Sequence, residues 1–194
     1  RTTCRLCLRP NIEVVLKLAA TPVADDYLPK DKLNKHQDKY PLDLVLCRDC
    51  AHAHILDVVD PEILYANFNY VTLGSLGLDE HFGKYAEAVL GHLNLQKGSC
   101  VVEFGSNDGT LLKYFKKQGM KVLGIDPARE IARQATEAGI ETLPTYFTTE
   151  LSKKIRADRG PAAVIAANNV IANVDDVHDM IRGGDTAARI GGEE

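Results

Sequence analysis

The chain has 194 residues and a formal net charge of −4, and 45% of its residues are hydrophobic. This composition predicts a globular protein of one ordinary domain or two small ones, and the lack of a long basic run argues against a nucleic-acid partner. No apolar run approaches the ~18 residues that a membrane span needs, so we expect no membrane association. Arg1 leads into a polar, cysteine-bearing segment rather than an apolar signal sequence, so we expect a cytoplasmic protein with reduced thiols.

Two Cys-x-x-Cys pairs lie in the first fifty residues, Cys4 with Cys7 and Cys47 with Cys50. Thiolates three positions apart can bind one ion from a tight turn, and two such turns complete the tetrahedral shell of Zn²⁺. Because four cysteines leave no coordination position for a substrate, we expect a structural zinc ion. The 39 residues from 8 to 46 exceed the usual spacing of a zinc ribbon and predict an insertion between the pairs. Two disulfides, or four unrelated thiols, are the alternative.

Two histidines beside the second pair, His52 and His54, are further possible zinc ligands. They alternate with small and apolar residues, and this period of two favours one face of a strand instead. The fifth cysteine, Cys100, stands alone in an apolar run and is interpreted as a small core side chain.

The sequence pattern divides the chain into three regions. We expect a zinc-binding domain over 1–62, a helical connector with a substrate-side loop over 63–97, and a partial Rossmann-like domain over 98–194. The first region needs a metal because a unit of this size has little core. The second contains aromatic residues from Tyr65 to Tyr70 and then an apolar stripe at helical spacing that begins at Phe82.

From residue 99 onward, strand patterns alternate with helix patterns. Strands are predicted over 100–105, 121–126, 141–146 and 162–168, and helices over 110–118, 128–138, 148–157 and 174–182. This alternation predicts an α/β fold with a parallel sheet and right-handed crossovers.

The residues after 182 contain no convincing strand. We therefore expect the sheet to stop after its fourth strand, and the chain to be a fragment or to have an aberrant terminus. Because folded proteins avoid an open apolar sheet edge, this arrangement predicts self-association through that edge.

The loop that follows the first predicted strand of the sheet indicates a ligand. A strand that feeds a helix through a glycine-bearing loop is how α/β proteins hold nucleotide-like ligands. A dinucleotide fingerprint would place glycine at 103 and 108, where this chain has carboxylates that repel a pyrophosphate. The carboxylates favour S-adenosyl-L-methionine (SAM), which carries an ammonium and a sulfonium. We expect the cofactor to be bound by Glu103, Gly105, Ser106, Asn107, Asp108 and Gly109.

Asp126 ends the second predicted strand of the sheet, where an acidic side chain accepts hydrogen bonds from ribose hydroxyls. We therefore add Asp126 and the adjacent Pro127 to the cofactor site. Helix capping is the alternative for Asp108 and Asp126, with Pro127 at a first helical position. Asn168 and Asn169 close the fourth strand at the carboxyl edge of the sheet, where ligands of such sheets bind, and complete the predicted set.

Taken together, these motifs resemble the sugar C-methyltransferases that act on nucleotide-linked keto-deoxysugars. The resemblance runs from about Cys4 to Asp179. It rests on the paired Cys-x-x-Cys, the Tyr40-Pro41-Leu42 segment, residues 65–70, the Glu-Phe-Gly-Ser-Asn-Asp-Gly loop at 103–109, Gly124 to Ala128, and Asn168 to Ala172.

This resemblance implies a zinc-binding N-terminal domain, a SAM-binding Rossmann-like domain of the class I methyltransferase type and a C-terminal domain. It implies removal of a proton beside a sugar ketone and methylation of the enolate. It also makes Tyr70 a catalytic or substrate-side candidate.

The chain departs from the family pattern in two respects. Asn173 stands where the family has a histidine, and asparagine cannot act as a general base near neutral pH, although it can bind a sugar. The family's His-Glu-His catalytic segment lies beyond the last residue of the chain. We therefore expect this chain to be inactive alone. Asn173 is kept as a candidate catalytic residue because of its position, although it cannot serve as the base.

Three other functions stay open from sequence. One is a methyltransferase with another small-molecule acceptor, and a second is a non-catalytic module that binds zinc and a nucleoside. The third is an NAD-dependent oxidoreductase, against which the two loop carboxylates argue.

Overall fold

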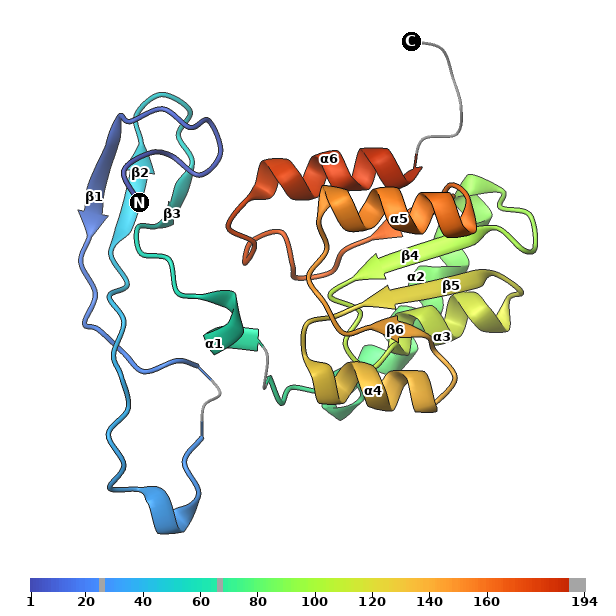
Figure 1. Ribbon diagram of the computed structural model, residues 1–194, viewed down its shortest axis with the longest axis horizontal. Helices are drawn as coiled ribbons and strands as arrows, with labels where there is room; N and C mark the ends of the chain where they lie inside the picture. The colour runs from blue at the N-terminus through green and yellow to red at the C-terminus, as the bar shows by residue number, and fades with distance from the viewer. Residues whose placement is uncertain (25–26, 66–67, 189–194) are drawn as a thin grey trace. The chain divides into compact units, whose positions relative to one another are not determined.

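The computed structural model describes residues 1–24, 27–65 and 68–188, which form two compact units (Figure 1). One unit comprises Arg1–Phe68 with Asp175–Val177, and the other comprises Asn69–Val174 with His178–Glu194. The sequence-based boundaries were 62 and 97. The helix that begins at Leu78, assigned there to a connector, belongs to the second unit.

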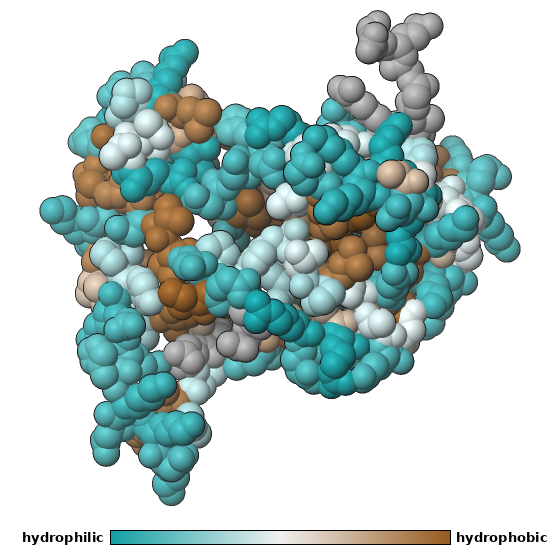
Figure 2. Space-filling view, viewed as in Figure 1, coloured by the Kyte–Doolittle hydropathy of each residue, from teal (hydrophilic) through white to brown (hydrophobic). Residues whose placement is uncertain are grey.

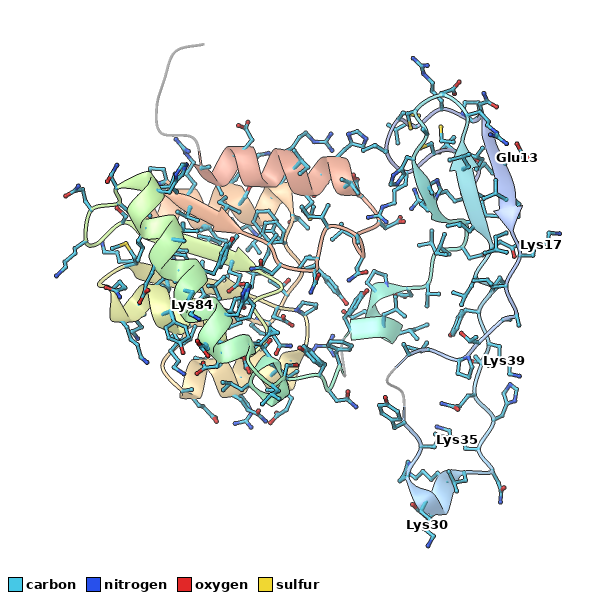
Figure 3. The ribbon with its side chains drawn as sticks, turned by 180° about the vertical axis from the view of Figure 1, so that it is seen from behind. Glu13, Lys17, Lys30, Lys35, Lys39 and Lys84 are labelled. Atoms are coloured by element: carbon cyan, nitrogen blue, oxygen red, sulfur yellow. The ribbon has the colours of Figure 1, made fainter. Side chains whose placement is uncertain are left out.

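The first unit is built on an antiparallel sheet in the order β1-β2-β3. These strands are β1 (Ile12–Leu16), β2 (Leu44–Cys47) and β3 (Ala53–Ile55), and the short helix α1 (Pro61–Tyr65) follows. Between β1 and β2 the chain runs outward to the 3₁₀ helix η1 (Lys30–Lys32), and an isolated bridge joins Thr21 to Tyr40 on the way. Figure 3 shows this excursion, which carries the labelled Lys17, Lys30, Lys35 and Lys39. It is the insertion that the cysteine spacing predicted.

The second unit is an α/β domain around a parallel sheet in the order β6-β5-β4-β7. Its strands are β4 (Cys100–Phe104), β5 (Lys121–Ile125), β6 (Thr142–Leu143) and β7 (Val164–Ala166). Its helices are α2 (Leu78–Leu93), α3 (Thr110–Lys117), α4 (Arg129–Glu137), α5 (Thr149–Arg159) and α6 (Val177–Ala188), and η2 (Thr72–Gly74) precedes α2. The predicted alternation and parallel sheet are confirmed.

Each face of this sheet has its own apolar core. On one face, Val101 packs with Ala86 of α2 and with Leu112 and Phe115 of α3. On the other face, Val102 packs with residues of α5 and α6 such as Met180. Because strand side chains alternate between faces, Glu103 shares the face of Val101 and points toward the α2 and α3 layer.

The structure corrects the predicted bounds near the end of the domain. The strand expected over 141–146 is reduced to two residues, and the helix expected over 174–182 begins at Val177 and continues to Ala188. The helix passes through Gly183 because this glycine lies against α5. A Cβ at position 183 would come within 3.2 Å of the Thr149 backbone nitrogen. The prediction that no strand follows residue 182 also covers residues 189–194, which lie outside the described residues.

Within the described residues, β7 has β4 as a neighbour and no strand on its other side. In the same part of the chain, none of the helices is long and apolar enough to cross a bilayer.

Apolar side chains also reach the surface along β1, where Val14, Val15 and Leu16 are 38%, 45% and 49% exposed (Figure 2).

Candidate active site and metal centre

The four paired cysteines converge in the first unit. All four Sγ atoms of Cys4, Cys7, Cys47 and Cys50 lie within 4.8 Å of one another. The Cys4–Cys50 and Cys7–Cys47 sulfur distances are 3.7 Å and 3.5 Å. A tetrahedron with Zn–S bonds of about 2.3 Å has edges of about 3.8 Å, whereas a disulfide needs about 2.05 Å. The donor set and its spacing therefore fit a closed, structural zinc site, and the disulfide alternative is wrong.

His54 lies in β3, as the alternating pattern predicted, and its ring is engaged away from the cysteines. Its Nδ1 donates to the carbonyl of Ile55 at 2.9 Å, and its Nε2 accepts from the Arg5 backbone N–H at 3.4 Å. Arg5 lies between Cys4 and Cys7, so its hydrogen bond to this buried histidine stabilises the turn that carries the first cysteine pair. His54 does not belong to the four-sulfur cluster.

In the second unit, the loop from β4 to α3 is shaped by glycines at both ends. Gly105 has φ of +68°, and a Cβ there would lie 2.2 Å from Val170 Cγ2. Gly109 has φ of +75°, and a Cβ there would lie 2.7 Å from Ile140 Cγ2. Both positions require glycine, because L side chains are strained at these angles and no space is available. The loop backbone therefore turns tightly over the carboxyl end of β4.

The Asp108 carboxylate stabilises the start of α3. Its Oδ1 accepts from the Thr110 N–H at 3.1 Å and from the Thr110 hydroxyl at 2.6 Å. Gly109 occupies the N-cap position of α3, and Asp108, one residue earlier, accepts from the first helical N–H. Its Oδ2 accepts from the Leu73 N–H at 2.9 Å, which links the loop to η2.

Asp126 follows β5 and lies beside the same loop. Its Oδ2 accepts from the Asn107 N–H at 2.8 Å, and its Oδ1 accepts from the Ala128 N–H at 2.9 Å. Burial raises the pKa of Asp126, the two backbone hydrogen bonds oppose that rise, and the charge of Asp108 adds to it. Pro127 does not occupy a first helical position, because α4 begins at Arg129.

Glu103 lies within the buried stretch of β4, one residue before its end, and is 3% exposed. Its Oε1 accepts from Asn168 Nδ2 at 3.2 Å, while its Oε2 is buried without a hydrogen-bond partner among the described residues. Burial raises the pKa of Glu103 to about 8, the Asn168 hydrogen bond opposes that rise, and the charges of Asp126 and Asp108 add to it. A cation placed against Oε2 would stabilise the ionised carboxylate.

A second buried polar atom without a partner in the described part of the chain is the Ser106 Oγ. It lies close to β5, since a Cβ on Gly124 would come within 2.5 Å of it. Buried polar atoms normally have partners, so two such atoms at one strand end indicate that a ligand completes the site. A ligand that offers both an ammonium and hydrogen-bond acceptors, as SAM does, fits this pair.

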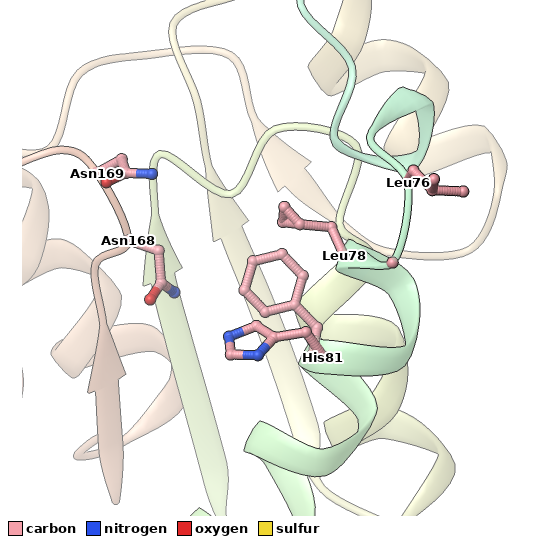
Figure 4. A pocket seen from close by; sticks show the side chains of 7 residues that line it. Leu76, Leu78, His81, Asn168 and Asn169 are labelled. Carbon is pink, nitrogen blue, oxygen red and sulfur yellow. The ribbon is translucent and has the colours of Figure 1, made fainter.

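A pocket of about 510 Å³ opens at the carboxyl end of β7 beside the start of α2 (Figure 4). Its lining comprises Leu76, Gly77, Leu78, His81, Phe82, Asn168 and Asn169. Figure 4 shows Leu78 and His81 of α2 facing the two asparagines. The sequence pointed to the asparagines and missed Leu76, Leu78 and His81, because no spacing motif marks them and only the tertiary position of α2 brings them there.

The two residues predicted to be catalytic have different surroundings. The Tyr70 hydroxyl lies 2.8 Å from Ser75 Oγ, and the side chain is 43% exposed. Asn173 is also exposed, and its Nδ2 donates to the Asn169 carbonyl at 2.9 Å. Through this hydrogen bond Asn173 is linked to Asn169, which lines one side of the pocket. Tyr70 precedes η2, and the chain continues from η2 to Leu76 and Gly77 on the other side.

Comparison with known proteins gives matches over both units. Residues 4–65 match a family described as "Putative zinc binding domain", and residues 79–184 match a family described as "Methyltransferase domain". The chain is 32% identical over 180 residues to the C-methyltransferase NovU of Streptomyces niveus. That alignment covers 93% of this chain and 43% of NovU, so the chain spans less than half the length of this relative.

The chain also matches solved structures of methyltransferases at low identity. The magnesium protoporphyrin IX methyltransferase ChlM from Synechocystis PCC 6803, with bound S-adenosylhomocysteine (SAH), is 14% identical, with a TM-score of 0.46 and coverage of 58% of this chain and 52% of that one. A SAM-dependent methyltransferase from Geobacter sulfurreducens in complex with SAH is 23% identical, with a TM-score of 0.40 and coverage of 56% and 45%.

The family matches agree with the four-cysteine cluster of the first unit and the Rossmann-like parallel sheet of the second. The chain therefore belongs to the methyltransferase-domain family that matches residues 79–184, with a match to a putative zinc-binding domain preceding it in the chain.

Proposed function

We propose that this chain binds SAM at the carboxyl ends of β4 and β5 and takes part in C-methylation of a nucleotide-linked keto-deoxysugar. The observation that carries the cofactor half is the buried Glu103 carboxyl, whose Oε2 has no partner among the described residues. A carboxylate in that position attracts the ammonium of SAM, and it disfavours the pyrophosphate of a dinucleotide. When bound, SAM supplies an electrophilic methyl group on its sulfonium.

The ribose of the cofactor is proposed to lie against Asp126. Both carboxylate oxygens already accept one backbone N–H each, which fixes the orientation of the side chain. Each oxygen retains a second lone pair for a ribose hydroxyl. Pro127 follows directly and limits the backbone freedom of Asp126.

The acceptor is proposed to enter the pocket between α2 and the end of β7. One part of its lining is apolar, from Leu76, Leu78 and Phe82, and the other is polar, from His81, Asn168 and Asn169. Such a lining suits a deoxysugar ring, which has both an apolar face and oxygen substituents. The choice of a sugar rests on the sequence resemblance, and NovU is a C-methyltransferase by its name.

Carbon methylation requires that a proton leave the carbon beside the ketone before the methyl group is attached. Asn173 cannot accept that proton near neutral pH, and its side chain already donates to Asn169. Tyr70 is proposed to hydrogen-bond the acceptor. We therefore expect the chain to bind SAM and the sugar, and to show no methyl transfer from labelled SAM to a TDP-4-keto-deoxysugar. Appreciable transfer would contradict this part of the proposal.

Calorimetric titration with SAH, with NADH in parallel, tests the cofactor half. We expect SAH to bind and NADH not to bind. Asp126→Asn should weaken SAH binding about tenfold, because a hydrogen bond to a charged group contributes about 1.5–3 kcal/mol. Asp158→Asn makes the same charge change at an exposed position of α5 and should have no effect. Failure of SAH to bind would overturn the proposed function.

The acceptor half is tested by titrating a TDP-4-keto-deoxysugar into the SAH-saturated chain. His81→Ala should weaken sugar binding without changing SAH affinity. Lys84→Ala is the matched control, since Lys84 lies one turn further along α2 in an exposed pair with Glu80 (Figure 3). If both substitutions changed the sugar affinity equally, this pocket would not be the acceptor site.

A further inference from the structure

The side chain of Asn107 faces away from the residues that are proposed to hold the cofactor. Its backbone N–H donates to Asp126, but its Oδ1 accepts from the Thr72 N–H at 2.9 Å and from the Thr72 hydroxyl at 3.1 Å. Its Nδ2 donates to the Tyr70 carbonyl at 2.8 Å. One residue of the cofactor loop therefore makes three side-chain hydrogen bonds to a segment 35 to 37 positions earlier in the chain.

The segment Tyr70–Leu73 has little apolar burial. Tyr70, Val71 and Leu73 are 43%, 38% and 53% exposed, and η2 contains no buried residue. Asp108 adds a fourth hydrogen bond from the loop, to the Leu73 N–H. A segment with few buried apolar contacts is ordered by its polar contacts, so its position depends on the loop.

The same segment leads into the wall of the pocket. It continues through η2 to Leu76 and Gly77, which line the pocket, and the Tyr70 hydroxyl contacts Ser75 on the way. Asn107 therefore connects a carboxylate on the ribose side, Asp126, with a wall on the acceptor side.

We propose that Asn107 is a positioning residue that couples the two half-sites: a cofactor held on Asp126 and the loop backbone orders Tyr70–Leu73 and so forms the acceptor wall. This inference rests on the proposed function and departs from the expectation that the Asn107 side chain itself contacts the cofactor. The physical basis is entropic. A ligand that orders the loop also orders what the loop holds, and the acceptor then binds a wall that is already in place.

The left-handed backbone of Asn107, with φ of +51°, suggests a clean substitution. Asn107→Gly removes all three side-chain hydrogen bonds, retains the N–H that donates to Asp126, and adopts this φ without strain. Thr72→Val removes only the hydroxyl hydrogen bond. Amide hydrogen exchange by NMR, measured with and without SAH, gives the readout at Thr72 and Leu73.

Without ligand, Asn107→Gly should accelerate exchange at the Thr72 amide about tenfold, and Thr72→Val should do so about twofold, in line with the number of hydrogen bonds lost. With SAH, the wild-type chain should show slower exchange at Thr72 and Leu73, and Asn107→Gly should lose this response at Thr72. The Asn107→Gly chain should keep its SAH affinity within about threefold while its sugar affinity falls about tenfold. Unchanged protection of the Val101 and Val102 amides in β4 shows that the fold is intact.

Two results would overturn the coupling. One is a wild-type chain that binds SAH without slower exchange at Thr72, and the other is an Asn107→Gly chain that keeps the SAH response. If SAH gives no heat with the wild-type chain, the proposed function fails and the coupling with it. The ligand-free comparison then still decides whether Asn107 orders the segment.

Discussion

Asn168, just after the edge strand β7, donates a hydrogen bond to one oxygen of Glu103 in the neighbouring strand β4, and the other carboxylate oxygen is buried without a partner among the described residues. This hydrogen bond links the buried, ionisable Glu103 of β4 to Asn168, which lines the pocket. Burial raises the pKa of Glu103 from its ordinary value of 4.5 to about 8. Near neutral pH this carboxyl is therefore protonated in the folded chain and ionised in the unfolded chain.

The first prediction concerns the pH dependence of stability. The folded chain holds the Glu103 proton up to about pH 8, whereas the unfolded chain releases it near pH 4.5. The stabilisation from this group is therefore complete below pH 4.5, and it is lost as pH rises through 8. Glu103→Gln cannot ionise, so it should be more stable than the wild-type chain at pH 8.5, by about 2 kcal/mol in urea unfolding. Equal pH slopes for the two chains would contradict the prediction.

Glu103→Gln should also affect the cofactor. It retains an acceptor for Asn168 but cannot attract an ammonium, so SAH binding should weaken even though the fold becomes more stable. Calorimetry at pH 8.5 checks this opposition of stability and affinity. Tighter or unchanged SAH binding in the variant would argue against contact between Glu103 and the cofactor amine.

A third prediction concerns metal removal. A chelator, or Cys47→Ser, should unfold the first unit and leave the second unit folded, because a structural zinc site contributes its binding energy to folding. Protein-to-zinc stoichiometry and the exchange of β2 amides measure the effect. Cys100→Ser is the matched control, since Cys100 lies outside the cluster, against the core of the second unit. Loss of zinc from the control, or retention of one zinc ion by Cys47→Ser with β2 still protected, would exclude the four-sulfur site.

A fourth prediction compares two glycines. Gly105→Ala should destabilise the second unit by about 2 kcal/mol or more, because its Cβ would lie 2.2 Å from Val170 and its φ is positive. Gly91→Ala, in α2, meets no atom within 4 Å and should stabilise the chain by about 0.5–1 kcal/mol. Thermal unfolding of the two variants should therefore shift in opposite directions, and shifts of the same sign would refute the packing argument.

The last prediction concerns the edge of the sheet. Within the described residues, β7 has a strand on one side alone, and unpaired strand edges favour association between chains. Size-exclusion chromatography with light scattering should show a mass that rises with protein concentration. A monodisperse monomer over the whole range would rule out association through this edge.

The sequence was informative where a single residue type has a single chemical use. Paired cysteines predicted the metal cluster, and the alternation of apolar patterns predicted the parallel sheet. Gly105 and Gly109 marked the loop, because few other residues tolerate its backbone. The resemblance in turn predicted the family.

Side-chain direction was beyond reach of the sequence. Asn107 and Asp108 carry the groups expected of a ligand site, yet their side chains hold Tyr70–Leu73, and only the tertiary fold shows this. The helical state of Gly183 was missed because glycine disfavours helices in isolation, whereas close packing against α5 requires it. His81 lines the pocket because of where α2 packs in the fold, and no local sequence pattern predicts that position.

The four-cysteine cluster has an evolutionary consequence for the excursion between β1 and β2. The metal joins chain segments on either side of residues 8 to 46, and β1 and β2 pair within that range, so the ends of the excursion are fixed while its length is free. The entropic cost of closing a flexible loop rises slowly, by about 0.6 kcal/mol for each doubling of length. Insertions and deletions here are thus nearly neutral for folding, and the excursion is the part of the first unit where homologous chains can diversify most freely.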